Sequence, residues 1–503
     1  MLAGKTVEIG RRLLLVVAAT AGLIIAARML AGPFRLLLPV NTPLNAEGLF
    51  GLAASLALLG QVAGKEKRWP RLGTGILAAA VVLVAIAALG RALTFYFLSD
   101  DFILVRGAST WIRDQFWRQF TSGGGDGYYR PIGAVSLVAS SIMAGFHPWL
   151  WHAFGLALHA ANCVLVLLLA RRLGASRLAG FFAAALYAIH GTRPEAVVWI
   201  AARFDLLATF FVLAGLLLFP RFKAAALAMM ALAILSKEVG YVFPLLLLLF
   251  PEGRRWKVAA PFFAVAAALF AYRWTLFGGI GGYRVGGVAQ VAVVGLPTLK
   301  ALTIRLWAAL YFPINWSVEP SRWIGALAIV YMIAVLWLLR SGTRSYFGFG
   351  FILISALPAL QLLGIAADLG NSRVLYLPSV GFCLMLAMAL DHRSRDRRER
   401  FAIAAVLLIF HFVALQHNLA DWAYASEKTK AACVSGAAYT RSSSTFRAFG
   451  LPITLRGVPA LANGFAECIE IEGGRRVEVS REGNVVLTWD RALDQIVCMR
   501  GCR

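Results

Sequence analysis

Long runs of hydrophobic residues recur along the chain and set its architecture. A helix that crosses a bilayer core needs about 20 apolar residues, and its backbone must bond internally because lipid offers no hydrogen-bond partners. The run from Leu72 to Phe97 is the least ambiguous of these segments. An all-α polytopic membrane protein with about 13 transmembrane helices is therefore predicted. The predicted spans are 13–31, 46–63, 72–97, 149–170, 176–190, 203–219, 222–236, 239–250, 257–277, 322–339, 346–364, 373–390 and 401–417.

The composition excludes a string of soluble domains. Hydrophobic residues make up 60% of the 503 residues and charged residues 15%, whereas soluble proteins have about 45–50% and about 25%. The chain has 49 Lys and Arg against 25 Asp and Glu, a net charge of +24, which by itself would also suit a nucleic-acid-binding protein. No basic stripe with interleaved aromatic residues lies outside the loops, so we expect the bilayer, and no nucleic acid, as a partner.

Basic residues in the short loops predict the orientation, because Lys and Arg are retained on the cytoplasmic side. The densest cluster lies within 393–400. All such clusters fall on one side if the N-terminus is cytoplasmic and if the apolar stretches 131–146 and 297–312 do not cross. We therefore expect these two stretches to be helices at the outer surface. The aromatic-rich segment 111–120 is also expected to rest at the interface.

Hydropathy falls after residue 417, and 418–503 is predicted to be a small extracytoplasmic domain with β content. The alternation of residues over 476–480 and 485–489 predicts a hairpin. Four cysteines in an exported segment favour two disulfides, whose pairing stays open, over a metal site, because this segment has no His and no CxxC. The disulfide candidates are Cys433, Cys468, Cys498 and Cys502.

The domain organisation follows from these boundaries. Residues 1–71 form a two-span extension, and 72–417 form a transmembrane module whose first outer loop is 98–148. Residues 418–503 form the third unit.

Two adjacent carboxylates, Asp100 and Asp101, follow the third span in a chain where acidic residues are scarce. At a water–lipid boundary, neighbouring charge and partial burial raise a carboxyl pKa toward that of a working general base. An ordinary acidic helix end is the alternative interpretation.

Several basic residues lie on the predicted outer side, where such residues are disfavoured, and three of them, besides Arg203, are candidates to bind a ligand. The three are Arg130 before a proline, Lys237 in a Ser-Lys-Glu step, and Arg373 at the start of the twelfth span. An anionic ligand such as a phosphate would explain basic residues there. For Arg130 alone, an ordinary interfacial arginine is the alternative.

The segment 190–205 concentrates further polar residues. Glu195, Trp199 and Arg203 follow one another at one helical turn, so we expect them to share a face. Arg203 and Asp205 open a span, where unpaired charge is costly. A structural pair, Glu195 with Arg203 or Arg203 with Asp205, is the alternative to a functional role.

Several of these motifs together resemble the GT-C superfamily of integral-membrane glycosyltransferases. They are the acidic pair, Tyr129-Arg130-Pro131, the segment 152–162, the segment 190–205 with its R-x-D ending, the Ser-Lys-Glu step and the segment 371–379. The resemblance covers about 95–390 and is greatest to the protein O-mannosyltransferase-like branch, which in animals carries tetratricopeptide repeats.

The resemblance implies a transferase that takes a sugar from a polyprenyl-phosphate carrier and transfers it, with inversion at C1, on the outer face. By position, Asp100 is the first choice for the base and Asp101 the second, and Arg130, Lys237 and Arg373 would bind the lipid phosphate. Some members use a divalent metal, so a metal stays open and no other cofactor is expected. Residues that would shape or brace the sugar pocket are Tyr129, His190, Glu195, Arg203, Asp205 and Tyr376.

The chain also departs from this branch. Two spans precede the one that leads into the acidic pair, the repeats are missing, and a cysteine-containing tail replaces them. The acceptor therefore stays open among a protein hydroxyl, a glycan and a lipid. A transporter or lipid flippase is the first alternative function, although no clear inverted repeat is visible, and a non-catalytic scaffold is the second. The expected location is a bacterial inner (plasma) membrane, with the C-terminal unit periplasmic or extracellular.

Overall fold

The computed structural model describes residues 74–114, 116–122, 127–282, 284–285, 288–289, 295–318, 321–339, 346–358, 365, 367–393, 397–480 and 483–501. The predicted spans 13–31 and 46–63 lie outside the described residues, as does Cys502.

Each predicted span within the described residues overlaps a helix, although 239–250 holds only the five-residue α12 after a 3₁₀ turn. Among the described residues, five helical segments are long and apolar enough to cross a membrane: Thr74–Thr94, Pro148–Arg172, Ile200–Leu218, Trp256–Phe277 and Phe401–Tyr439. The total of about 13 spans and their orientation remain predictions. The helices on the predicted spans are α3 (Thr74–Leu89), α7 (Pro148–Arg172), α8 (Arg177–Ile189), α10 (Arg203–Leu218), α11 (Lys223–Ser236), α12 (Phe243–Leu247), α13 (Trp256–Phe277), α16 (Arg322–Leu339), α17 (Tyr346–Ala356), α18 (Pro378–Arg393) and α19 (Arg397–Tyr439).

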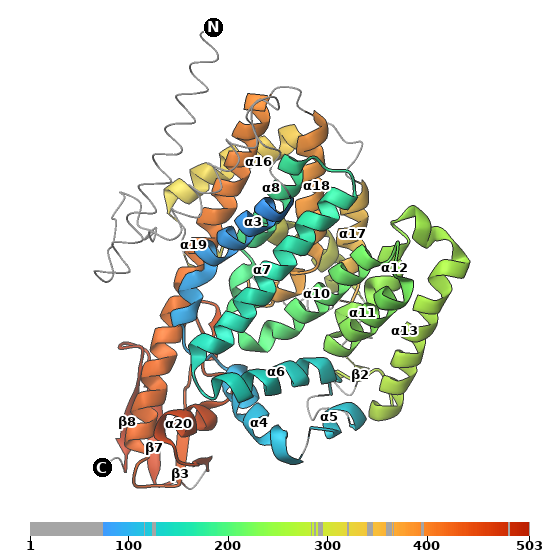
Figure 1. Ribbon diagram of the computed structural model, residues 1–503. Helices are drawn as coiled ribbons and strands as arrows, with labels where there is room; N and C mark the ends of the chain where they lie inside the picture. The colour runs from blue at the N-terminus through green and yellow to red at the C-terminus, as the bar shows by residue number, and fades with distance from the viewer. Residues whose placement is uncertain are drawn as a thin grey trace.

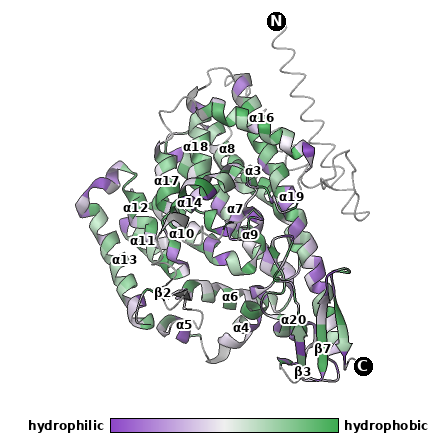
Figure 2. Cartoon of the chain, turned by 180° about the vertical axis from the view of Figure 1, so that it is seen from behind, coloured by the Kyte–Doolittle hydropathy of each residue, from purple (hydrophilic) through white to green (hydrophobic). Residues whose placement is uncertain are grey.

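Helix α7 lies at the centre of the bundle and packs against α3, α8 and α10 (Figure 1). Helices α17 and α18 approach closely at two glycines, because a Cβ on Gly348 would lie 2.6 Å from the carbonyl oxygen of Gly381. Small residues permit such close helix packing in membranes. Figure 2 shows mostly hydrophobic residues along α16, α17 and α18, and hydrophilic residues where α19 runs toward the C-terminal strands.

Three shorter helices gather at one end of the bundle, the same end that carries the C-terminal strands (Figure 1). The predicted interfacial segment 111–120 is divided between two of them. The stretch 297–312 is also helical, through α14 (Leu296–Lys300), a π-helical turn over Ala301–Arg305 and α15 (Leu306–Tyr311). The three helices at this end are α4 (Asp100–Asp114), α5 (Arg118–Thr121) and α6 (Pro131–Ala144).

Helix α19 is 43 residues long, so the predicted domain boundary at residue 418 falls inside it. Beyond the helix, four strands form a sheet in the order β6-β3-β7-β8. They are β3 (Thr445–Phe449), β6 (Glu478–Val479), β7 (Val485–Asp490) and β8 (Gln495–Arg500).

The predicted hairpin between 476–480 and 485–489 is wrong. Strands β6 and β7 both pair in parallel with β3, which lies between them, and the antiparallel pair is β7 with β8. The link between β6 and β7 passes over β3 at Gly483, where a Cβ would lie 2.5 Å from the backbone of Phe446. Phe446 of β3 is fully buried and packs against Phe465, and it shares the core of this sheet with Val485 and Leu487 of β7.

A disulfide between Cys433 and Cys468 joins α19 to α20 (Phe465–Gly473). Cys498 is also disulfide-bonded. The strands β4 (Thr454–Leu455) and β5 (Val458–Pro459) form a separate short hairpin before α20.

Candidate functional site

A pocket of about 260 Å³ lies where α4 and the C-terminal domain meet the helix bundle. Asp100 and the three basic residues singled out in the sequence all line this one pocket. Its wall carries three cationic groups and one carboxylate, a surface suited to an anion next to a proton acceptor. The lining includes Asp100, Arg130, Lys237, Arg373, Tyr128, Trp199, Phe204 and Asn463.

Glu238 holds Arg130 at the pocket wall. The Nη2 of Arg130 lies 2.8 Å from Oε2 of Glu238, and Nη1 of Arg273 lies 2.8 Å from Oε1 of the same carboxylate. The Arg130 guanidinium also stacks over the Tyr128 ring, 4.1 Å from its centroid. Burial alone would raise the pKa of Glu238, but the two guanidinium groups outweigh it and lower that pKa to about 2. Glu238 is therefore ionised at all physiological pH values, and its two contacts keep Arg130 in place.

Lys237 lies in a break between two helices. Its backbone is extended (φ −162°, ψ 153°) between α11 and the 3₁₀ turn over Glu238–Val242, which frees its side chain to reach α10. There Nζ lies 2.6 Å from Oδ2 of Asp205. Burial lowers the pKa of Lys237, as do the positive charges of Arg130 and Arg373, while the Asp205 carboxylate raises it.

Glu195 fixes the segment that carries Arg373. Its carboxylate accepts hydrogen bonds from the backbone N–H groups of Asn371 (3.0 Å) and Arg373 (2.8 Å), from Oγ of Ser372 (3.1 Å) and from Nη1 of Arg373 (2.5 Å). The Arg373 guanidinium then lies over Trp199, 4.8 Å from the ring centroid. One buried carboxylate thus sets both the backbone and the side chain of this arginine.

Asp100 and Asp101 have different surroundings. Asp101 is 1% exposed, and its carboxyl group accepts the N–H groups of Leu98 (3.1 Å) and Ala201 (2.9 Å). Burial raises its pKa to about 8 against these two hydrogen bonds, which favour the ionised form. Asp101 fastens the start of α4 to the 3₁₀ turn over Ile200–Ala202, whereas Asp100 is half-buried and opens into the pocket.

The predicted shared face of Glu195 and Arg203 does not form, because the chain is not one helix there. Helix α9 (Arg193–Val198) ends at an extended Trp199, and α10 begins at Arg203. Arg203 is buried and bonds Oγ of Ser140 at 2.7 Å. Within the described residues, Arg203 pairs with neither Glu195 nor Asp205, whose ion-pair partners are Arg373 and Lys237.

Three other predicted residues lie outside the pocket and make bracing contacts. The Tyr129 hydroxyl donates to the carbonyl oxygen of Phe120. His190 contacts Thr192 and the carbonyl oxygen of Leu310 through its two ring nitrogens. The Tyr376 hydroxyl joins His159 and Asn162 of α7 at 2.7 and 3.2 Å.

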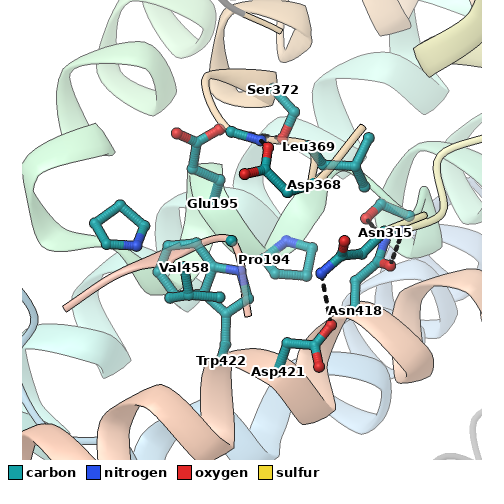
Figure 3. A pocket seen from close by; sticks show the side chains of 14 residues that line it. Pro194, Glu195, Asn315, Asp368, Leu369, Ser372, Asn418, Asp421, Trp422 and Val458 are labelled. Carbon is teal, nitrogen blue, oxygen red and sulfur yellow. Dashed lines mark hydrogen bonds between the residues drawn. The ribbon is translucent and has the colours of Figure 1, made fainter. Parts of the chain in front are cut away.

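A second, much smaller pocket lies behind Glu195, between the bundle and the C-terminal domain (Figure 3). Its volume is about 20 Å³, room for about one water molecule. Figure 3 shows Asn315 bonded to Asp421 on the side opposite Glu195, and the Nδ2–Oδ2 distance is 2.8 Å. Across the part of the chain that the structure describes, no group of three or more His, Cys, Asp or Glu side chains could hold a metal ion.

The pocket contains residues that the sequence did not single out. Tyr128 and Phe204 are aromatic residues among many. Glu238 does not line the pocket; it belongs to the Ser-Lys-Glu step, but only the structure shows that it binds Arg130 and Arg273. Asn463 lies 363 residues from Asp100 in sequence, so no local signal connects the two.

Comparison with known proteins shows similarity to O-mannosyltransferases. The chain is 24% identical over 387 residues, 60% of its length, to the human protein O-mannosyl-transferase TMTC4, of which it covers 52%. It is 36% identical over 109 residues to protein O-mannosyl-transferase Tmtc2 of Drosophila melanogaster, a match that covers 21% of this chain and 12% of that protein. The chain thus spans about half the length of human TMTC4.

Among solved structures, the fold is similar to ArnT from Cupriavidus metallidurans bound to undecaprenyl phosphate. The TM-score is 0.45 at 14% identity, with 84% of this chain and 94% of that chain covered. No family model matches the chain. The similarity to TMTC4 of human and mouse confirms the predicted resemblance to the O-mannosyltransferase-like branch of the GT-C superfamily of membrane glycosyltransferases.

Proposed function

We propose that this protein is an inverting glycosyltransferase that moves a sugar from a polyprenyl-phosphate carrier to an acceptor hydroxyl at the outer face of the membrane. The observation that carries the proposal is the pocket in which Asp100 lies together with Arg130, Lys237 and Arg373. A base and an anion-binding wall in one pocket are the two parts that this reaction requires.

In the proposed step, Asp100 takes the proton of the acceptor hydroxyl as its oxygen attacks C1 of the sugar. The bond between C1 and the phosphate oxygen breaks, and its electron pair stays on the phosphate. Attack from the face opposite the leaving group inverts C1. Arg130, Lys237 and Arg373 stabilise the negative charge that develops on the departing polyprenyl phosphate.

The other predicted site residues act through these four. Asp101 positions Asp100 by fixing the start of α4, and Glu195 and Asp205 hold Arg373 and Lys237 at the wall. Arg203, Tyr129, His190 and Tyr376 brace the helices around the pocket through the contacts described above.

Mannose is the first sugar to test, and a protein hydroxyl the first acceptor, because the relatives are named protein O-mannosyl-transferases. We place the protein in a bacterial inner membrane with a cytoplasmic N-terminus. The C-terminal domain then lies outside the cytoplasm, on the same side as the pocket.

The test uses the full chain in proteoliposomes, with radiolabelled polyprenyl-phosphate mannose as the donor. Released polyprenyl phosphate and mannose bound to protein are both measured. We expect Asp100→Asn to lower the rate by at least about 100-fold, the low end of a general base's contribution. Asp490→Asn, in β7 away from the pocket, is the matched control and should leave the rate unchanged.

A wild-type rate in Asp100→Asn would refute the assignment of the base. Movement of intact donor across the bilayer without release of polyprenyl phosphate would favour the transporter. Other polyprenyl-phosphate sugars in the same assay identify the donor.

A further inference from the structure

The C-terminal domain reaches the pocket through residues 460–464, which we name the docking loop. The backbone N–H of Ser99 donates to the carbonyl oxygen of Ala460 at 2.8 Å. The Nδ2 of Asn463 donates to Oδ1 of Asp100 at 2.7 Å. Gly464 has a φ of +77°, and a Cβ there would lie 2.8 Å from the Cβ of Phe102. The loop therefore fits closely against the residues on both sides of the acidic pair.

Two further contacts hold this domain in place independently of Asn463. Both come from α20, which follows the docking loop. Glu470 pairs with Arg106 of α4 at 2.7 Å, and Glu472 accepts a hydrogen bond of 2.6 Å from the Tyr96 hydroxyl. A substitution of the Asn463 side chain therefore leaves the domain held by these two contacts, to residues that precede and follow Asp100 in the sequence.

The residue before Asp100 has an unusual backbone. Ser99 has a φ of +49°, in the left-handed region that residues other than glycine seldom adopt. Such a conformation persists only where surrounding contacts hold it, and the bond to Ala460 is one of these contacts. The docking loop thus contacts both the backbone that starts α4 and the carboxylate of its first residue.

We propose that Asn463 is a positioning residue for Asp100, so that the C-terminal domain completes the active site. This inference rests on the proposed function. The amide of Asn463 binds Oδ1, while Oδ2 accepts no hydrogen bond from any residue that the structure describes. Oδ2 is therefore the oxygen available to take the proton of the acceptor hydroxyl. The fixed Oδ1 prevents the carboxylate from turning away from the acceptor.

The test compares three variants in the proteoliposome assay with polyprenyl-phosphate mannose. Asn463→Ala should lower kcat by about three- to tenfold, the value of one ordinary hydrogen bond, because this bond is exposed to solvent; the donor KM should be unchanged. Asn463→Asp should lower kcat further, because it places a second carboxylate beside Asp100. Asn463→Gln, which keeps an amide donor, should retain more activity than Asn463→Ala.

The control is Asn484→Ala, at an exposed asparagine of the same domain that does not line the pocket. It should match the wild type. Hydrogen exchange of 98–104 reports whether the loop stays docked, and it should be unchanged in Asn463→Ala. A purely structural role for Asn463 would instead speed this exchange and change KM together with kcat.

The two proposals fail in different ways. If Asp100→Asn abolishes transfer but Asn463→Asp keeps a wild-type kcat, the positioning role is overturned and the proposed function stands. If Asp100→Asn keeps a wild-type rate, the proposed function fails and the positioning role fails with it.

Discussion

Replacement of Glu195 by glutamine changes the side-chain shape very little but should displace Arg373 from the pocket wall. Glu195 is 4% exposed, and its two oxygens accept two hydrogen bonds each from residues 371–373. In Glu195→Gln, one oxygen becomes an NH₂ group that cannot accept. Two of the four donors then lose their partner, and the Arg373 guanidinium loses its counter-charge.

The cost follows from these contacts. A hydrogen bond to a charged group contributes about 1.5–3 kcal/mol, so two of them give about 3–6 kcal/mol. The removal of one partner from a buried ion pair costs about 3–5 kcal/mol, and the two estimates describe the same loss. In a chain of this size, about 1–2 °C of unfolding midpoint corresponds to each kcal/mol. We therefore expect Glu195→Gln to lower the midpoint by about 3–12 °C.

Glu470→Gln is the matched control, because Glu470 also pairs with an arginine: it lies 2.7 Å from Arg106. This pair is more exposed than that of Glu195, with side-chain exposures of 32% for Arg106 and 19% for Glu470. Such a pair contributes up to about 1 kcal/mol. Both variants are unfolded thermally in nanodiscs, and the KM for polyprenyl-phosphate mannose is measured. Glu195→Gln should also raise this KM about tenfold or more, because Arg373 loses its position. Equal midpoints in the two variants would refute this reasoning.

Two further predictions concern stability. The pKa of Asp101 is about 8 in the folded protein and about 3.9 in an unfolded chain, so between these values only the folded state binds this proton. The contribution of Asp101 to the free energy of unfolding is therefore greatest below about pH 4. It falls as the pH rises to about 8, by up to about 1.4 kcal/mol per pH unit. Asp101→Asn should remove this slope from midpoints measured between about pH 5 and 8, and an unchanged slope would contradict the raised pKa. The paired replacement of Cys433 and Cys468 by serine opens a loop of sequence separation 35 and should destabilise the C-terminal domain by about 4 kcal/mol. Reductant should destabilise the wild type by at least as much, because it also breaks the disulfide of Cys498. If reductant leaves the wild-type midpoint unchanged, the disulfide does not stabilise the domain.

The positions of the bundle helices could be predicted from hydropathy because a lipid-exposed backbone must form all its hydrogen bonds within a helix. The same measure could not find the end of α19. Polarity rises after residue 417, yet the next residues are rich in alanine and other good helix formers, and the helix continues to Tyr439. Hydropathy indicates where a segment meets lipid, and helix propensity indicates where it ends.

The residues of the pocket were only partly predictable. Basic residues on the disfavoured side identified Arg130, Lys237 and Arg373, which line one pocket. Glu195 and Asp205 were also identified, but their pairing with Arg373 and Lys237 was not. Helical spacing paired Glu195 with Arg203 because it assumed a continuous helix across Trp199, where the backbone is extended. The contact of Asn463 with Asp100 could not be predicted, because the two residues are 363 positions apart in sequence and come together only in the folded protein.

Helix α19 also determines where the docking loop lies relative to the helix bundle. Its 43 residues span about 65 Å at 1.5 Å per residue, about twice the hydrocarbon core of about 30 Å. One continuous helix therefore joins the C-terminal domain to the bundle. No flexible linker has to be ordered before the docking loop can contact Asp100, which lowers the entropic cost of that contact. Each residue inserted into α19 after residue 417 would rotate the C-terminal domain about the helix axis by about 100° and move the docking loop away from the pocket. The length and rotational phase of one helix are thus part of the geometry of a site that none of its own residues line.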